Sequence, residues 1–249
     1  MIEKLDYFKD PNFKFDERTH SYTYINPETG LPTQIFESVS GFIDQFKKPF
    51  DNSVSKYVAK SRGMTQQEVL NEWSQLATEG KRVGTLVHKW IEDYYSGLNP
   101  EMTGDTSADH RINLFLDLHR ERLHRLNPIT QELRIFSKAW GIAGTVDIIF
   151  EMDGKYYVGD WKTNRDFKDD DHPKGRREYL LHPFDNYWSN NLSGYSLQIS
   201  TYRIILEEAG FETAGGFLVS LSESGYKMYK TLDFRDQLRS YLEKNNFSF

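Results

Sequence analysis

The sequence predicts an α/β protein with a central mixed β-sheet of about five strands, a usual sheet size, flanked by helices. Residues 142–150 and 155–162 are β-rich runs joined at Asp153-Gly154, a pair that supplies the positive φ of a tight hairpin. Four further segments carry helical or strand periodicity: apolar stripes at helical spacing in 83–94 and 197–206, and alternation in 214–221 and 226–232. Strands and helices in this order predict a layered domain.

A single domain is expected, because 249 residues suffice for one sizeable core. We expect it to span residues 1–249, with an N-terminal hairpin appendage at 1–36, the chemistry-bearing core at 80–232 and a long insertion at 164–193. A connection of that length is uncommon in a compact domain unless it is functional. A lid over the site and a surface insertion both remain open.

The N-terminal segment predicts a small antiparallel hairpin. Aromatic and polar residues alternate in 13–16 and 20–25, and residues 26–30 are rich in turn formers. His20 is interpreted here as an ordinary strand histidine.

Helix-capping signals follow the hairpin. Ser38 caps a short apolar-periodic segment that ends before Pro49. Thr65 and Glu68 have the spacing of a capping box, and the helical pattern that they open resumes after Gly80.

The middle and the end of the chain alternate loops, helices and strands. Residues 99–108 are polar and predict a loop, 112–126 predict a helix, and 131–136 predict a strand that leads into the central hairpin. Asp233 is expected to cap a last amphipathic helix.

The central hairpin carries the residues that indicate chemistry. Side chains alternate along a strand, so Asp160 and Lys162 share one face while Trp161 points to the other. Asp147 lies in an otherwise apolar run, where a buried acid is costly unless a cation compensates it. A divalent metal between Asp147 and Asp160 meets that need, and two carboxylates with open positions suit Mg²⁺ or Mn²⁺.

Two helical segments place further polar side chains one turn apart. Gly84, His88 and Glu92 lie along one stripe, and Gln198 and Tyr202 lie along another. A glycine one turn from His88 leaves open space above the backbone for a metal or a phosphate. For each polar residue the alternative is an ordinary position on a helix surface.

Asp147 followed by Asp160-x-Lys162 on the next strand resembles the signature of the PD-(D/E)XK nuclease superfamily, and Gly144 stands where that name has its proline. The resemblance implies a restriction-endonuclease-like core and hydrolysis of phosphodiester bonds in DNA.

The flanking helices resemble the RecB-type exonuclease branch of that superfamily. Gly84-x-x-x-His88 lies upstream and Gln198-x-x-x-Tyr202 downstream, in the expected order. The resemblance covers roughly residues 80 to 220.

By this resemblance, Mg²⁺ or Mn²⁺ would be held by four groups: Asp147, Asp160, His88 and the backbone carbonyl of Trp161. Lys162 would orient or deprotonate a metal-bound water and stabilise charge on the phosphate. The 3′ oxygen would leave, giving a 5′-phosphate product. Four residues would position the substrate: Gln198, Tyr202, Gly84 and Thr163.

Further residues are candidates for the same site. By the resemblance, Glu132 is an acid on the first strand near the metal, and the alternative is a surface salt bridge with Arg134 or a neighbour. Glu92 is a candidate because it lies one turn after His88, and the alternative is an ordinary helix-surface position. The insertion carries Lys174, Arg176 and Arg177, basic residues that suit contact with a nucleic-acid backbone.

The function implied is an exonuclease that acts on DNA ends in phage recombination, DNA repair or phage DNA metabolism, with a single-strand annealing or recombination protein as a candidate partner. One alternative is a structure-selective or site-specific endonuclease on the same fold. Another is a catalytically silent nuclease fold that binds nucleic acid.

Composition removes several other classes. The chain has no cysteine, which excludes disulfides, thiol catalysis and a cysteine-ligated iron–sulfur cluster. No apolar run approaches the ~20 residues of a membrane helix, and the N-terminus lacks the pattern of a secretion signal, so a cytoplasmic protein is expected. A net charge of −6 leaves room for a local basic patch that contacts phosphate.

Overall fold

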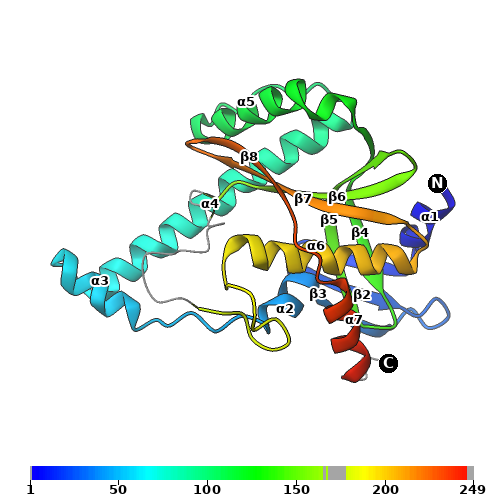
Figure 1. The fold of residues 1–249 in the computed structure, drawn as a ribbon, viewed down its shortest axis with the longest axis horizontal. Helices are drawn as coiled ribbons and strands as arrows, with labels where there is room; N and C mark the ends of the chain where they lie inside the picture. The colour runs from blue at the N-terminus through cyan, green and yellow to red at the C-terminus, as the bar shows by residue number, and fades with distance from the viewer. Residues whose placement is uncertain (1, 165–166, 168–177, 246–249) are drawn as a thin grey trace.

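The computed structural model describes residues 2–164, 167 and 178–245. Its N-terminal half contains α1 (Ile2–Asp6), η1 (Tyr7–Lys9), β1 (Phe13–Asp16), β2 (Ser21–Ile25), β3 (Pro32–Ser38), α2 (Val39–Asp44), α3 (Val54–Arg62), α4 (Gln66–Tyr95), α5 (Thr106–Glu121) and η2 (Leu123–Arg125). The rest contains β4 (Asn127–Ser137), β5 (Ile142–Met152), β6 (Lys155–Lys162), α6 (Asn191–Glu208), β7 (Thr213–Ser222), β8 (Gly225–Lys230) and α7 (Arg235–Lys244). Figure 1 shows their arrangement.

The strands form one mixed sheet of eight strands in the order β1-β2-β3-β5-β6-β7-β8, with β4 also paired to β5. The α/β class is as predicted, but the predicted number of about five strands was too low. The N-terminal hairpin is extended by a third strand, β3, which joins the sheet by parallel pairing with β5 at Ile142 and Ala143. Such a pairing between segments a hundred residues apart leaves no periodic signal in the sequence.

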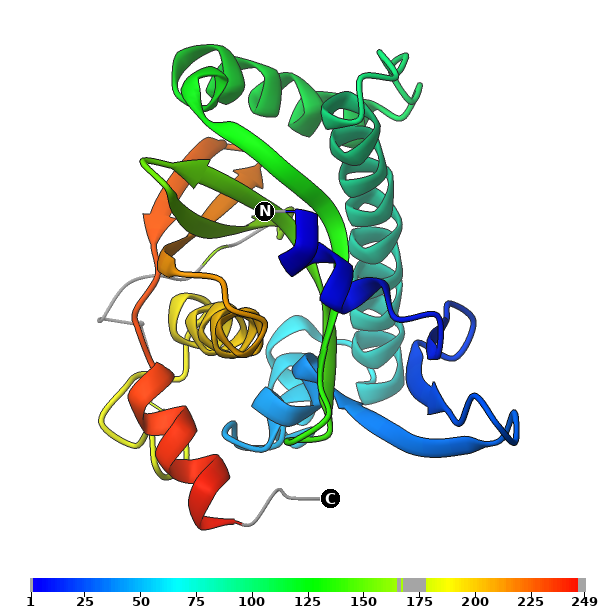
Figure 2. The ribbon, with the colours of Figure 1, turned by 90° about the vertical axis from the view of Figure 1, so that its right-hand side faces the viewer.

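Helices cover both faces of the sheet (Figure 2). One apolar core lies between the sheet and α2, α6 and α7, and a second lies between the sheet and α4 and α5. Coverage on both faces explains why β5 is an almost continuous apolar run rather than an alternating one. Of the two acids in β5, Glu151 lies near its end, whereas Asp147 lies in the middle of the apolar run and stands out physically as well as in the sequence.

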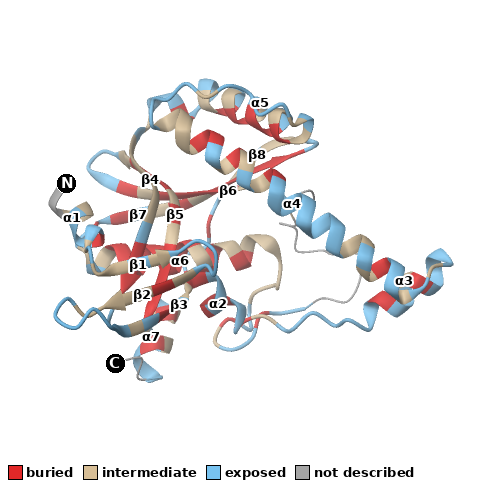
Figure 3. Cartoon of the chain, turned by 180° about the vertical axis from the view of Figure 1, so that it is seen from behind, coloured by how far each residue is buried: buried red, intermediate tan, exposed pale blue. Residues whose placement is uncertain are grey.

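Helix α4 is a single helix of 30 residues. The predicted capping box is present: the Glu68 amide donates to Thr65 Oγ1 at 3.2 Å, and the Thr65 amide donates to Glu68 Oε2 at 2.7 Å. Helix α3 packs against its beginning and α5 against its end, while every residue from 74 to 82 is exposed (Figure 3). None of the described helices is long and apolar enough to cross a membrane.

Two segments differ from expectation. Helix α7 has Phe234, one residue later than expected, as its N-cap. Asp233 accepts the amide of Arg235, the first helical residue, at 3.2 Å, and it also accepts hydrogen bonds from arginine side chains. Within the predicted insertion, Leu180 and Phe184 are buried, and the Leu181 amide donates to the Phe46 carbonyl at 2.7 Å. This described part of the insertion is thus a loop packed into the core rather than a lid.

Candidate metal centre

The site lies where β5 and β6 separate. The Asp153-Gly154 turn joins them, both residues having positive φ, and the two strands pair from Met152↔Lys155 as far as Ile148↔Gly159. On the same edge, β3 pairs with β5 only at 142–143. Residues 144–147 therefore have no partner among the described strands on this edge.

Asp147 fills the gap that this separation opens. Its Oδ2 accepts a hydrogen bond from the Trp161 amide at 2.9 Å, so a side chain takes the place of the missing strand-to-strand bond. The side chain is 11% exposed, which leaves part of the carboxylate open to the cleft.

His88 reaches the same place from helix α4. Its Nε2 is 2.9 Å from the Trp161 carbonyl oxygen, and its Nδ1 is 3.4 Å from Asp147 Oδ2. A neutral imidazole has one N–H and one lone pair, so one ring nitrogen here always faces an oxygen acceptor without a proton between them. A metal cation bound at the nitrogen that lacks a proton, or a second proton there, would make both contacts favourable.

Glu132 joins them from β4. It is one of four non-glycine residues with positive φ in the described chain, at +46°, and it lies between the paired residues Gln131 and Leu133. Its carboxylate, His88 and Asp147 offer ligand atoms that all lie within 4.8 Å of one another. Burial raises the pKa of Glu132 to about 7, with a further contribution from Asp147.

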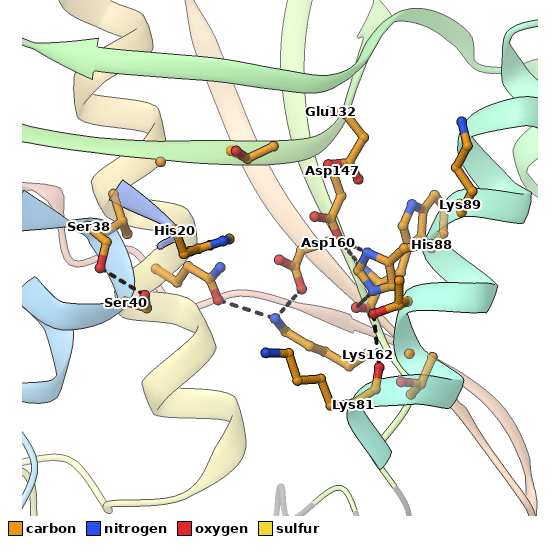
Figure 4. A pocket seen from close by; sticks show the side chains of 18 of the residues that line it. His20, Ser38, Ser40, Lys81, His88, Lys89, Glu132, Asp147, Asp160 and Lys162 are labelled. Carbon is orange, nitrogen blue, oxygen red and sulfur yellow. Dashed lines mark hydrogen bonds and ion pairs between the residues drawn. The ribbon is translucent and has the colours of Figure 1, made fainter. Parts of the chain in front are cut away.

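Asp160 and Lys162 share one face of β6, as predicted, and Trp161 is buried on the other (Figure 4). Lys162 Nζ lies 2.6 Å from Asp160 Oδ2, an ion pair in which the oxygen nevertheless has no partner of good hydrogen-bond geometry. Burial and Asp147 raise the pKa of Asp160 to about 6 despite this lysine. Burial opposes the charge on Lys162, but the carboxylates outweigh it and raise its pKa.

The compact ligand group is His88, Glu132 and Asp147, whereas the Asp160 carboxylate is paired with Lys162. The metal position between Asp147 and Asp160 stays a prediction, and Glu132 is a further candidate ligand.

Gln198 and Tyr202 on α6 both face the site, as expected from their spacing. Lys162 Nζ donates to Gln198 Oε1 at 3.2 Å, and Gln198 Nε2 donates to the Tyr202 hydroxyl at 2.8 Å. A Cβ at Gly144 would lie 2.7 Å from the Tyr202 ring, so the glycine lets α6 approach β5.

The remaining predicted residues have mixed outcomes. The space above Gly84 is not open: a Cβ there would lie 3.1 Å from Thr163 Oγ1, so the glycine allows α4 and the end of β6 to approach. Glu92 lines the cleft but forms an ion pair with Lys89 at 3.1 Å. Lys174, Arg176 and Arg177 lie outside the described residues.

These side chains line one wall of a cleft of about 1410 Å³. The cleft exceeds the ~300–1,000 Å³ of small-molecule pockets, which suits a polymer. Sequence reasoning missed several of its lining residues: Lys81, Phe15, His20, Tyr22 and Arg134. The alternation of residues 13–25 indicated a hairpin, but no local signal showed which element that hairpin would face.

The donor set fits a hard divalent cation. Two carboxylates and an imidazole offer ligand atoms within 4.8 Å of one another, and the Trp161 carbonyl lies 2.9 Å from His88 Nε2. The buried Asp160 Oδ2 lies 2.6 Å from Lys162 Nζ. Oxygen-rich sites with a single imidazole suit Mg²⁺ or Mn²⁺ better than they suit metals that prefer sulfur.

Comparisons with known proteins add little to this geometry. No protein-family model matches the chain, and no curated protein matches it. Among solved structures, the chain is similar to "Crystal structure of SSO0001", with 13% sequence identity, 88% of this chain and 78% of that chain covered, and a TM-score of 0.35. A likeness of this size carries no argument about function.

Proposed function

We propose that this protein is a metal-dependent deoxyribonuclease of the PD-(D/E)XK superfamily, related to its RecB-type exonuclease branch. One observation carries the proposal. In a cleft large enough for a polymer, several acids lie together, and they outnumber the cations that pair with them. Among the described residues, Lys162 is the lysine or arginine that forms an ion pair with one of the three acids Glu132, Asp147 and Asp160. The other lysine and arginine residues of the cleft are Lys81, and Lys89 and Arg134, which pair with other carboxylates. Such an excess is costly unless a cation is bound.

The groups that would hold Mg²⁺ or Mn²⁺ are His88, Asp147, Glu132, Asp160 and the Trp161 carbonyl. When bound, the ion would supply Lewis-acid stabilisation of the phosphate and a water of lowered pKa. The chain's own residues prepare the rest of the site.

Lys162 brings a positive charge to the site. Burial opposes its charge, but Asp160 and Asp147 outweigh burial and raise its pKa. We assign it to stabilising charge on the phosphate oxygens and to orienting or deprotonating the attacking water.

Gln198 and Tyr202 hold this charge in position. The chain of hydrogen bonds from Lys162 through Gln198 to the buried Tyr202 fixes the ammonium relative to the cleft, where a strand would be aligned for attack.

The finer fold assignment is part of the proposal. Strands β4 to β8, with α4 and α5 on one face and α6 on the other, correspond to the five-stranded restriction-endonuclease-like core. The β1–β3 strands are then an addition that supplies the second wall of the cleft.

The test uses linear and covalently closed circular DNA, each single- and double-stranded, with purified protein and Mg²⁺, Mn²⁺ or EDTA. We expect metal-dependent loss of the linear forms alone, because an exonuclease needs an end. Cleavage of circles would replace the exonuclease by an endonuclease. The absence of metal-dependent loss from every substrate would overturn the proposal.

A further inference from the structure

The wall of the cleft that faces helix α4 is aromatic. Phe15, His20 and Tyr22, from the β1–β2 hairpin, line the cleft together with Arg134 from β4. The ring centroids of Phe15 and His20 are 5.1 Å apart, edge to face, and those of Phe15 and Tyr22 are 4.7 Å apart. Figure 4 shows His20 on the opposite side of the pocket from His88.

The backbone at His20 is in the left-handed region, with φ +54°. It ends a turn in which Asp16 Oδ1 accepts bonds from the amides of Arg18 and Thr19, at 2.9 and 3.3 Å. A residue with positive φ is required at such a position, and besides glycine it is asparagine, aspartate and histidine that adopt it most often. The turn therefore explains the conformation, and histidine is one of several residues that meet its requirement.

The His20 side chain is accessible to a ligand in the cleft. The residue is exposed, and its ring nitrogens have no hydrogen-bond partner in the described part of the chain. An exposed ring on a strained backbone, facing a candidate catalytic cleft, points to a ligand.

The wall is fixed relative to the metal centre. Tyr22 is 2% exposed, and its hydroxyl lies 3.0 Å from Thr145 Oγ1, two residues before Asp147 on β5. The Phe15 ring is tilted by 31° against that of Tyr22, and the Arg134 guanidinium lies over it at 4.8 Å from the ring centroid. A planar group bound at His20 is therefore held at a constant distance from the metal ligands.

Base and phosphate contacts divide between the two walls. Arg134 is paired with Glu17 at 3.5 Å, so a carboxylate stands on the aromatic rim and disfavours a phosphate there. Lys81 lines the α4 wall, where it suits the backbone of a strand, whereas Lys89 on the same wall is paired with Glu92 and Asp93. Aromatic faces bind nucleobases by stacking, whichever base is present.

We propose that His20, supported by Phe15, is a stacking surface for a nucleobase of the strand that enters the cleft. A base stacked there is unpaired, so the site selects single-stranded DNA or an end whose bases have separated. This inference deepens the proposed nuclease function and depends on it for the substrate, although binding itself requires no hydrolysis.

The test measures binding in EDTA, so that no strand is cut. The probe is a 12-nucleotide oligothymidylate with a fluorophore at one end, in a series in which each nucleotide in turn is replaced by an abasic analogue. For the wild-type protein we expect one position at which base removal weakens binding about tenfold. A blunt duplex of the same length should bind more weakly than the single strand.

Two substitutions identify the protein side of that contact. His20→Asn tolerates the positive φ but removes the ring; it should bind the intact strand about tenfold more weakly and lose its response to the abasic position. His20→Tyr keeps a stacking ring and should stay within about threefold of wild type. His124→Asn, which replaces an exposed histidine outside the cleft, is the matched control and should bind as wild type.

The inference is overturned if His20→Asn binds the intact strand like wild type, if it still responds to the same abasic position, or if no strand binds. Its failure is separable from that of the nuclease proposal. If the protein cleaves DNA with metal but the His20 variants bind like wild type, only the stacking proposal is rejected. If binding depends on one base and on His20 but no DNA is cleaved, the stacking proposal is supported and the nuclease proposal is rejected.

Discussion

Two buried clusters of charged side chains in this protein are built differently. One is the candidate metal centre, and the other surrounds Arg203 on α6, the same helix that carries Gln198 and Tyr202. Arg203 is 2% exposed, and all three of its nitrogens donate: Nε to Thr213 Oγ1 at 3.0 Å, Nη1 to Asp233 Oδ2 at 3.0 Å and Nη2 to the Thr213 carbonyl at 3.1 Å.

In the Arg203 cluster three arginines surround two acids, and each acid is paired with two of the arginines. Arg235 and Arg239 both form ion pairs with Glu207, and Arg235 also bonds Asp233. The hydrogen bonds from Arg235, together with the charge of Arg203, hold the pKa of Asp233 well below its usual range. Here the folded chain supplies its own counterions.

The metal centre has the opposite balance. Its acids outnumber its cations, and the pKa values of Glu132 and Asp160 are raised rather than lowered. A cluster in which every acid is paired with a cation of the chain has a structural role. A cluster whose acids lack such partners and face a cleft is a candidate for function.

The largest effect is expected for Asp160→Asn. Removing this carboxylate should lower metal-dependent cleavage on the order of 10³-fold or more, because it removes a candidate ligand and the counterion of Lys162. Initial rates on linear DNA measure it. Asp236→Asn, at a fully exposed acid beside Arg239, is the control and should cleave at the wild-type rate. An Asp160→Asn protein with more than a tenth of wild-type activity would refute the site.

Arg203→Met should lower the stability of the protein rather than its activity. It removes the hydrogen bonds that the buried guanidinium donates to Thr213 and Asp233, while Arg235 still pairs with Asp233. The free energy of unfolding should therefore fall by about 1–3 kcal/mol, measured by urea denaturation. The cleavage rate per folded molecule should stay within a factor of two. A rate that falls in proportion to the lost stability at temperatures where the variant is folded would show that the two clusters are coupled.

Glu132→Gln should change how stability depends on pH in EDTA. The folded carboxyl has a pKa of about 7, above the unfolded value, so the folded state binds more protons between those values and the wild-type stability falls as pH rises through that window. The variant lacks this slope and should be more stable at pH 8 by on the order of 2 kcal/mol. Equal slopes for both proteins would show that Glu132 is ionised normally.

The smallest effect is expected for Gln198→Ala. It removes the bridge between Lys162 and the Tyr202 hydroxyl without touching a candidate metal ligand. We expect about a tenfold fall in kcat with stability nearly unchanged, from steady-state kinetics beside a thermal melt. A fall as large as that of Asp160→Asn would place Gln198 in direct contact with the reacting groups.

Local signals were sufficient for part of this site. The Asp153-Gly154 turn formed the predicted hairpin, and the two-residue period of β6 brought Asp160 and Lys162 to 2.6 Å. The helical period likewise allowed Gln198 and Tyr202 to bond each other. These features depend on turn chemistry and on periods of two to four residues, which a sequence displays directly.

Other features depended on the tertiary structure. The pairing of β3 beside β5 opened the edge at Asp147, and the positive φ of Glu132 brought a third acid to His88. The same pairing set the hairpin that carries His20 across the cleft. The sequence by itself determined which residues share a face of each element, because that follows from local geometry. Which elements meet was decided only by the packing of segments far apart in the chain, for which no short-range pattern exists.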